Sequence, residues 1–583
     1  MPYQDPIKEF GKKLRQFKYF FQNVVLSMGY STIGDWITKF FIPITFLSFI
    51  VLGTLFFLSN LPKWWLIIWL MIYVGFIVIY PLKVYFGKIL DIKSHLFFFI
   101  TYVTSLSTLQ ISRTLIFKRV SQNKKFGFLS ELAERLVYFS KAWNLGFSTA
   151  ARKVKKLIPH KGLQNFFERL ATISDFGEDV ETFFLEEQDA IVDDIVAEHN
   201  RTYEYIRMIQ EVFVSIIITF SFVMVLLMLL PILSGNSLEG LIKILAMIIF
   251  TIDLSLVLIV RFIIPKDNLM HDLPITSDLA KKVHLSFLFS LPLTGILLAV
   301  LSYLFLPRLP FLIVVALSLT PLFIPAYLAN ELENKIVERD QAFPPFIRTF
   351  GGALEAKGGG MLSTMEGLLV QDFGPIQDIF ERLYVRLKLG NDKYASWLYF
   401  GGESDSNLIY NFSQIFAETV YLGGNAEKIA EVISKNMQKI LGLRKMKLQL
   451  VSGLRGALYG ALVGFASAGY IGIEVSARLA SIFSLPLEAM QNAGGEFLGG
   501  LFPQVPEVNV VMLSTYIGIM IIIHAFFSSY LLKMLDGGHK YAMFFDLIIM
   551  IWIGAILSWA IPFIVTKLLP AVTATASSLF TTI

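Results

Sequence analysis

Nine apolar runs divide this chain of 583 residues and constrain its fold more than any other feature. A run of about 20 apolar residues is long enough to cross a bilayer as an α-helix. Each run comes close to that length, so we expect the chain to cross a membrane repeatedly. The runs cover residues 40–59, 64–82, 212–233, 241–260, 284–306, 309–329, 456–475, 509–532 and 541–569.

The composition agrees with a membrane protein and excludes several other classes. Charged residues make up 16% of the chain and hydrophobic residues 55%, whereas a soluble protein has about 25% charged residues. A disordered chain needs low hydrophobicity and high charge, which this chain lacks. The absence of cysteine excludes disulfides, thiolate catalysis and iron–sulfur clusters.

Two long polar blocks interrupt the apolar runs. Their apolar residues recur every three or four positions, as in helices, and glycines at 351–352, 358–360, 401–402 and 423–424 are predicted to separate those helices. We therefore expect an all-α polytopic membrane protein with about nine transmembrane helices and two helical bundles. Its segments are an N-terminal stretch 1–39, two spans in 40–82, a first block 83–211, four spans in 212–329, a second block 330–455, and three spans in 456–583 with an outer loop near 476–508.

Lysine and arginine residues predict the orientation of the chain. Of 50 such residues, the first block holds 18 and the second block 15. Positive charge is retained on the cytoplasmic side of a membrane. With nine spans in the cell membrane, the N-terminus and both blocks are expected in the cytoplasm and the C-terminus outside.

The two polar blocks resemble each other at a nearly constant offset. Residues 134–136 (ERL) match 381–383 at an offset of 247, and residues 165–166 (NF) match 411–412 at an offset of 246. A rival offset of 213 leaves the starts of the following membrane runs unmatched. A sustained offset indicates one structural unit used twice. Because the counterparts of the apolar stretch 95–117 are charged, we expect that stretch to be a buried helix and not a tenth span.

The sequence contains no recognisable catalytic, cofactor or metal site. It has no phosphate-binding loop and no His-Glu-x-x-His motif. His271, Asp272, Asp267 and Asp278 offer possible ligands for a divalent ion, but their spacing matches no known site and favours a solvated loop. We expect that the protein is not an enzyme.

Basic clusters in the first block are candidate partner-binding residues. The basic cluster at 152–161 has two equally good interpretations. It binds an acidic protein, or it is simply a solvated surface. Nucleic acid is not expected, because no recognition motif accompanies the charge. A further cluster at 444–447 precedes the seventh run and suits anionic lipid headgroups. The candidates in the first block are Lys118, Arg119, Lys124, Lys125, Arg152, Lys153, Lys155, Lys156 and Lys161.

Two ionisable residues lie near the middle of apolar runs: Asp253 in the fourth and His524 in the eighth. Such groups are costly in a membrane, so they indicate either a proton or ion path or a packing hydrogen bond, and their small number favours packing. The seventh run has a stripe of small residues that lets a neighbouring span, or the same span of a second subunit, approach closely. The stripe consists of Gly456, Gly460, Gly464, Ala468 and Gly472.

Two polar helical repeats, each followed by a membrane helix, resemble the type II secretion system F domain of secretion and type IV pilus platforms. Residues 416–425 (FAETVYLGGN) are similar to the family's pattern of an acidic residue, then glycine, then a new helix, and residues 175–178 (DFGE) are a weaker counterpart. The resemblance covers about 95–235 and 342–475. The extra spans resemble the archaeal branch, in particular the archaellum platform family (FlaJ/ArlJ).

This resemblance implies a scaffold without catalytic activity. A hexameric cytoplasmic secretion ATPase would dock on the two repeats, and its motion would lift pilin or archaellin subunits from the lipid bilayer into a filament and, in archaella, turn it. The resemblance also implies motor accessory proteins as partners, and a homodimer. Two alternatives stay open: the platform of an adhesive archaeal type IV pilus, and a proton-coupled secondary transporter that uses Asp253 and His524.

Overall fold

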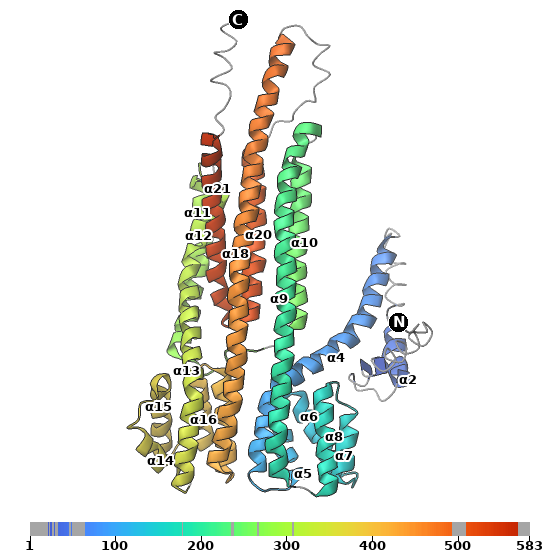
Figure 1. The fold of residues 1–583 in the computed structure, drawn as a ribbon, viewed down its shortest axis with the longest axis vertical. Helices are drawn as coiled ribbons and strands as arrows, with labels where there is room; N and C mark the ends of the chain where they lie inside the picture. Colours follow the sequence, from blue (N-terminus) through green and yellow to red (C-terminus); the bar gives the residue numbers. More distant parts are fainter. Residues whose placement is uncertain are drawn as a thin grey trace, which may run out of the picture. The chain divides into compact units, whose positions relative to one another are not determined.

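The computed structural model describes residues 64–568 except 178, 235–237, 265–266, 306–307, 359 and 493–508, together with parts of 21–48. Its regular elements are helices, and no strand occurs in these residues. The protein is therefore an all-α polytopic membrane protein, as the apolar runs predict. Figure 1 shows the helices from α2 (Ile33–Trp36) and α4 (Trp64–Ser107) to α21 (Met543–Leu568).

Eight helices in the described part of the chain are long and apolar enough to cross a membrane. They overlap eight of the nine predicted runs, and the remaining run, 40–59, lies largely outside the described residues. The eight segments are Tyr73–Ser107, Val180–Met228, Gly240–Ile263, Asp278–Phe305, Phe311–Ala356, Ala426–Ser481, Val510–Asp536 and Lys540–Leu568.

The predicted outer loop 476–508 is partly wrong. The helix α18 (Ala426–Asn492) continues through the first half of it, and residues 493–508 lie outside the described part. The first half contains alanine, leucine, glutamate and methionine, which are strong helix formers. Local helix propensity therefore extends this helix beyond its apolar run.

The helix order of the first polar block recurs in the second. Lys161 and Asn407, which begin α8 and α17, are 246 residues apart, and so are Val180 and Ala426, which begin α9 and α18. The helices thus follow the offset found in the sequence, and we name the two sets the first and second repeat. The first repeat is α5 (Arg113–Gln122), α6 (Phe128–Lys141), α7 (Phe147–Lys155), α8 (Lys161–Phe176) and α9 (Val180–Ser234); the second is α14 (Met361–Leu368), α15 (Gln377–Lys388), α16 (Lys393–Glu403), α17 (Asn407–Tyr421) and α18.

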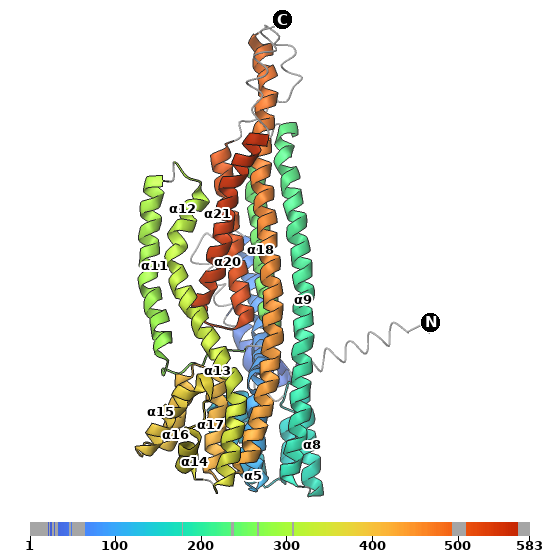
Figure 2. The same cartoon turned by 60° about the vertical axis from the view of Figure 1, so that its left-hand side comes forward.

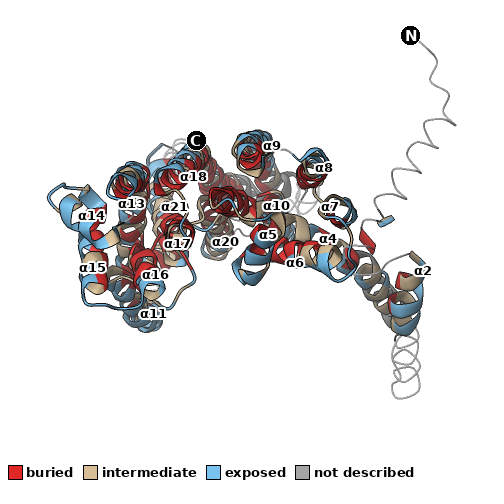
Figure 3. Ribbon diagram, turned by 90° about the horizontal axis from the view of Figure 1, so that it is seen from below, coloured by how far each residue is buried: buried red, intermediate tan, exposed pale blue. Residues whose placement is uncertain are grey.

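Residues 95–117 do not form one continuous helix as predicted. The helix α4 ends at Ser107 and α5 begins at Arg113. Between them Gln110 has a φ of 53°, a left-handed conformation that a right-handed helix cannot contain. Residues 96–107 are nevertheless buried, as expected of a packed helix. Seen from below, α5 and α6 also carry buried residues on one side and exposed residues on the other (Figure 3).

Two of the four predicted glycine breaks are wrong. Glycines at 358–360 and 423–424 lie between helices, but those at 351–352 lie inside α13 (Phe323–Ala356) and those at 401–402 inside α16. A Cβ atom added to Gly351 would meet the Cβ of Ala430 at 2.3 Å. None of these four glycines ends a helix, and Gly351 permits close packing of α13 against α18.

The chain forms two compact units. The first unit consists of Met1–Val196, Ile347–Thr364 and Gln414–Asn436. The second unit consists of Ala197–Phe346, Met365–Ser413 and Met437–Ile583, and it contains a large apolar core. Each unit thus includes parts of both repeats.

In the first unit, α9 and α18 meet at equivalent positions of the two repeats. Glu181 Oε1 lies 2.6 Å from Lys428 Nζ, and Asp189 Oδ2 lies 2.7 Å from Lys435 Nζ. These partners are 247 and 246 residues apart, which is the repeat offset. Equivalent residues contact each other only beside a two-fold axis, so the repeats pack here with pseudo-two-fold symmetry.

In the second unit, too, α9 and α18 contact each other at equivalent positions of the two repeats. The rings of Phe220 and Phe465 have centroids 6.0 Å apart, and the Ser476 hydroxyl donates a hydrogen bond to the Met228 carbonyl at 2.6 Å. The next helices, α10 (Leu238–Ile263) and α20 (Val510–Asp536), also pack on each other. Figure 2 shows α11 (Asp278–Phe305) and α12 (Phe311–Leu319) beside α21 of this unit.

Candidate functional site

Part of the basic cluster of α7 is neutralised by acidic side chains of α8. Arg152 Nη2 lies 2.6 Å from Asp175 Oδ2, and Lys155 Nζ lies 3.1 Å from Glu168 Oε2. Hydrogen bonds from Ser148 and from Arg152 lower the pKa of Asp175, so its carboxylate stays charged. Arg152 and Lys155 therefore hold α7 against α8 and have less charge to offer a partner.

Most of the other predicted basic residues keep their charge at the surface of the first repeat. Lys124 and Lys125 lie in a short 3-10 turn, where Lys124 Nζ is 3.4 Å from Glu134 Oε2. The exposed basic side chains for which the described part of the chain supplies no ion-pair partner are Lys118, Arg119, Lys153, Lys156 and Lys161.

An exposed aromatic patch beside these residues was not predicted. Trp143 and Tyr138 keep 53% and 54% of their surface exposed. Lys153 Nζ lies 4.6 Å from the centroid of the Trp143 ring, a cation–π contact. Aromatic and cationic side chains are enriched at protein interfaces. The available signal is the aromatic stretch 138–143 (YFSKAW), which continues past the end of α6 at Lys141.

The small-residue stripe of α18 is only partly used for packing inside the chain. A Cβ atom on Gly472 would meet the Met228 sulfur at 2.5 Å, so this end packs closely against α9. Ala468 is half-buried. In the described part of the chain, nothing lies within 4 Å of a Cβ atom added to the exposed residues Gly456, Gly460 and Gly464. This half of the stripe is open to another helix.

Asp253 of α10 and His524 of α20 form a buried pair. His524 Nδ1 lies 3.0 and 3.1 Å from the two carboxylate oxygens, and both side chains are at least 99% buried. In the tautomer that carries its proton on Nδ1, the imidazole donates to the Asp253 carboxyl oxygens. His524 Nε2 has no hydrogen-bond partner among the described atoms. The rings of Phe213 and Phe465 lie 6.3 Å from the imidazole, and this apolar surrounding favours a packing contact over an open path.

Arg444 does not face lipid headgroups as its position in the sequence suggested. Its Nη1 lies 2.6 Å from Asp340 Oδ2 and its Nη2 3.0 Å from Asp267 Oδ1, while Lys447 Nζ lies 2.7 Å from Asp267 Oδ2. We call these four residues the ionic junction. Burial by itself would raise the pKa of Asp267, but Arg444 and Lys447 outweigh burial and hold that pKa well below its usual range.

The polar loop between α10 and α11 is docked on the second repeat and is not simply solvated. His271 is buried, and its Nε2 donates a hydrogen bond to the Gly402 carbonyl at 2.8 Å. The Ser277 backbone N–H donates to Asp405 Oδ1 at 3.0 Å. In the part of the chain that the structure describes, no group of three or more side chains could hold a metal ion.

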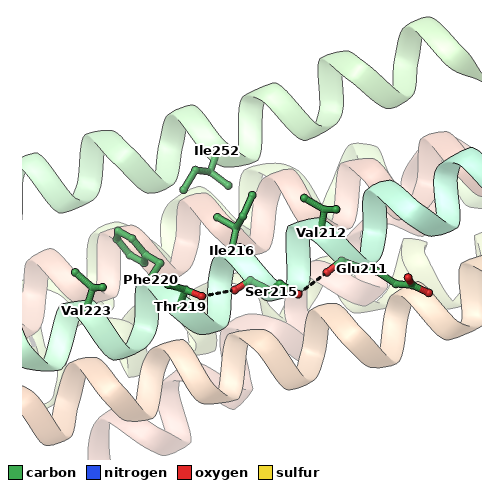
Figure 4. A pocket seen from close by; sticks show the side chains of 8 residues that line it. All are labelled: Glu211, Val212, Ser215, Ile216, Thr219, Phe220, Val223 and Ile252. Carbon is green, nitrogen blue, oxygen red and sulfur yellow. Dashed lines mark hydrogen bonds between the residues drawn. The ribbon is translucent and has the colours of Figure 1, made fainter. Parts of the chain in front are cut away.

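A groove of about 590 Å³ follows α9 beside Ile252 of α10 (Figure 4). The hydroxyl groups of Ser215 and Thr219 donate to the carbonyls of Glu211 and Ser215, both at 2.9 Å. These hydroxyls are therefore used within the helix. Among the lining residues only Glu211 is charged, so the groove offers an apolar contact surface and no constellation for catalysis.

Comparison with known proteins finds relatives along nearly the whole chain. The chain is 31% identical over 548 residues to "Flagella accessory protein J" of Methanocaldococcus jannaschii, which covers 92% of this chain and 96% of that protein. It is 26% identical over 552 residues to the protein of the same name from Methanococcus voltae, which covers 92% of this chain and 97% of the relative. No protein-family profile and no solved structure matches the chain.

Removing the carboxylate of Asp253 should destabilise the membrane core. In Asp253→Ala, the buried His524 loses its hydrogen-bond acceptor, which costs about 1–2 kcal/mol inside a membrane bundle. Unfolding of the purified full chain in detergent with increasing SDS, followed by circular dichroism, measures this loss.

The matched control is Asp253→Asn, whose amide oxygen still accepts from Nδ1 and should therefore lose less stability. If Asp253→Ala unfolds at the same SDS concentration as the unaltered chain, the pair contributes nothing to packing.

Proposed function

The chain belongs to the flagella accessory protein J family of archaellum proteins, and we propose that it is the membrane platform of an archaellum motor. In this proposal a hexameric cytoplasmic secretion ATPase binds the platform. Its ATP-driven motion moves archaellin subunits from the bilayer into the filament and turns the filament, together with motor accessory proteins. The observation that carries the proposal is similarity to a flagella accessory protein along 92% of the chain.

The distribution of positive charge supports an orientation for this platform. The polar blocks 83–211 and 330–455 hold 18 and 15 of the 50 lysine and arginine residues. Because such residues stay on the cytoplasmic side, both polar blocks and the N-terminal segment face the cytoplasm, and the C-terminus lies outside the cell membrane. The ATPase then meets the repeats on the side where it has access to ATP.

The first repeat supplies the ATPase docking surface in this proposal. Lys156 and Lys161 are exposed, and Trp143, which contacts Lys153, adds apolar contact area that charge alone does not provide. Such a surface fits a partner with acidic and apolar side chains. Arg152 and Lys155 support it indirectly, because they fix α7 on α8.

Two long helices are suited to pass motion from the docking surface toward the membrane. Both α9 and α18 begin with a polar segment of a repeat and continue as an apolar segment. They contact each other at equivalent positions in both units. A displacement of α9 would therefore also move α18, through the contacts that join their equivalent positions.

A second copy of the chain covers the open half of the glycine stripe in this proposal. Gly456, Gly460 and Gly464 lie on consecutive turns of α18, and no atom of the described residues lies within 4 Å of their Cβ positions. Stripes of this kind let two membrane helices approach closely. The platform is then a homodimer that pairs through α18.

Deletion of the gene should remove archaella and swimming together, because the filament cannot assemble without its platform. Electron microscopy of surface filaments, scored beside swimming and surface attachment, tests this expectation. Loss of attachment alone would identify the platform of an adhesive pilus. Filaments unchanged in number and type, in a strain without a paralogue, would overturn the platform function and return attention to transport through Asp253 and His524.

Charge reversal in Lys156→Glu with Lys161→Glu should weaken ATPase binding by about tenfold, and the loss should grow as salt is lowered, because exposed charges are screened by salt. The measurement is titration of the purified ATPase against the full chain in detergent at several salt concentrations. The control is Lys281→Glu with Lys282→Glu at the start of α11, which should bind normally. Equal affinity of both double variants would place the docking surface elsewhere.

Gly460→Leu with Gly464→Leu should break the homodimer and leave the monomer folded. A Cβ atom at either position meets no atom among the residues that the structure describes, whereas overpacking at an interface costs about 1–3 kcal/mol. Size-exclusion chromatography with light scattering gives the oligomeric state. Gly472→Leu is the contrasting variant, because it collides with Met228 and should destabilise the monomer itself. A double variant that remains dimeric would show that the open stripe faces lipid.

A further inference from the structure

A cavity of about 820 Å³ in the second unit has no role in the proposed function. Its walls are formed by α13 and α18, and the turn between α20 and α21 closes one side. It is lined by charged and amide side chains together with apolar side chains. A cavity of this size is large enough for a small ligand or a lipid headgroup.

The carboxylates in the wall already form ion pairs with lysine and arginine side chains. Glu333 and Asp536 share Lys533, at 2.6 and 2.8 Å, and Asp546 lies 2.8 Å from Arg455. The remaining acidic residues that line the cavity, Asp267 and Asp340, belong to the ionic junction. The acidic side of the lining is thus satisfied within the chain, and a cation would find no carboxylate without a partner there.

The polar groups of the lining that have no partner are mainly hydrogen-bond donors. Lys445 lines the cavity, and no partner for its ammonium group occurs in the described part of the chain. Arg455 donates a hydrogen bond from Nη2 to Asp546, which leaves Nε and Nη1 without a hydrogen-bond acceptor among the described residues. The amides of Asn330 and Asn334 face the same space. Donors that include an unneutralised positive charge suit an anion with several oxygen atoms.

The position of the cavity along the chain points to the edge of the bilayer. Arg455 immediately precedes the apolar run 456–475, and the turn that closes the cavity joins two apolar spans. Leu448, Val451 and Phe545 supply apolar surface beside the charged part of the lining. An anionic headgroup with attached hydrocarbon chains matches both parts.

We propose that this cavity binds a phosphate ester, held by Lys445 and Arg455, and that its source is the headgroup of an anionic membrane lipid. A soluble phosphate ester shares the same chemistry but would leave the apolar part of the lining unused. This inference does not depend on the archaellum function, because it rests only on the lining of the cavity.

The test uses the full chain in detergent with added phosphatidylglycerol, and native mass spectrometry counts the lipids that stay bound. Lys445→Glu should lower the affinity for one phosphatidylglycerol by about tenfold, because it replaces an attractive charge with a repulsive one. Asn334→Leu narrows the cavity without a change of charge and should also displace the lipid. Lys282→Glu, an exposed lysine outside the cavity, is the matched control.

The source of the phosphate is decided by competition. Phosphatidylglycerol that resists excess inorganic phosphate and glycerol phosphate supports the lipid headgroup, whereas displacement by either assigns the site to a soluble phosphate ester and overturns the lipid. Retention of the lipid in all three variants would overturn the site altogether. Circular dichroism of each variant confirms that a loss of binding does not reflect a loss of fold.

Discussion

The register between α9 and α18 is the contact on which the arrangement of the two repeats depends. In the first unit it is fixed by ion pairs, Glu181 with Lys428 and Asp189 with Lys435. In the second unit it is fixed by close packing, where Met228 fills the space beside Gly472 and accepts the hydrogen bond of Ser476. A slip by one residue would separate charges in one unit and create a steric clash in the other.

The parts of the fold that depend on local sequence could be predicted. Apolar runs locate membrane helices because the bilayer sets their length. The repeat offset predicts the spacing between equivalent helices, and the starts of α8 and α17 and of α9 and α18 follow it. Glycine was ambiguous, since the same residue ends a helix at Gly423, where φ is 96°, and permits close packing at Gly351. Only the neighbouring helix distinguishes the two roles.

The candidate sites depend on contacts between residues that are far apart in the sequence. Local sequence patterns do not predict such contacts. Arg152 belongs to a basic cluster in the sequence, yet Asp175 binds it in the fold. Arg444 and Lys447 lie beside a membrane run, yet Asp267 and Asp340 bury them, and only Lys445 remains at the surface. Asp253 and His524 were each recognised as exceptional in an apolar helix, but their pairing across 271 residues has no local signal.

The two repeats belong to one chain, so equivalent positions that meet beside the pseudo-two-fold axis can carry different residues. In a dimer of two identical half-length chains, the residues that meet at the axis are the same residue twice, so an aspartate would oppose an aspartate. Here Glu181 opposes Lys428, and Asp253 opposes His524 from helices that start 272 residues apart, at Leu238 and Val510. Fusing the halves lets each side of the axis carry a different residue. At Glu181 and Lys428 the molecule therefore has opposite charges, where a symmetric assembly would be confined to neutral or mutually repelling side chains.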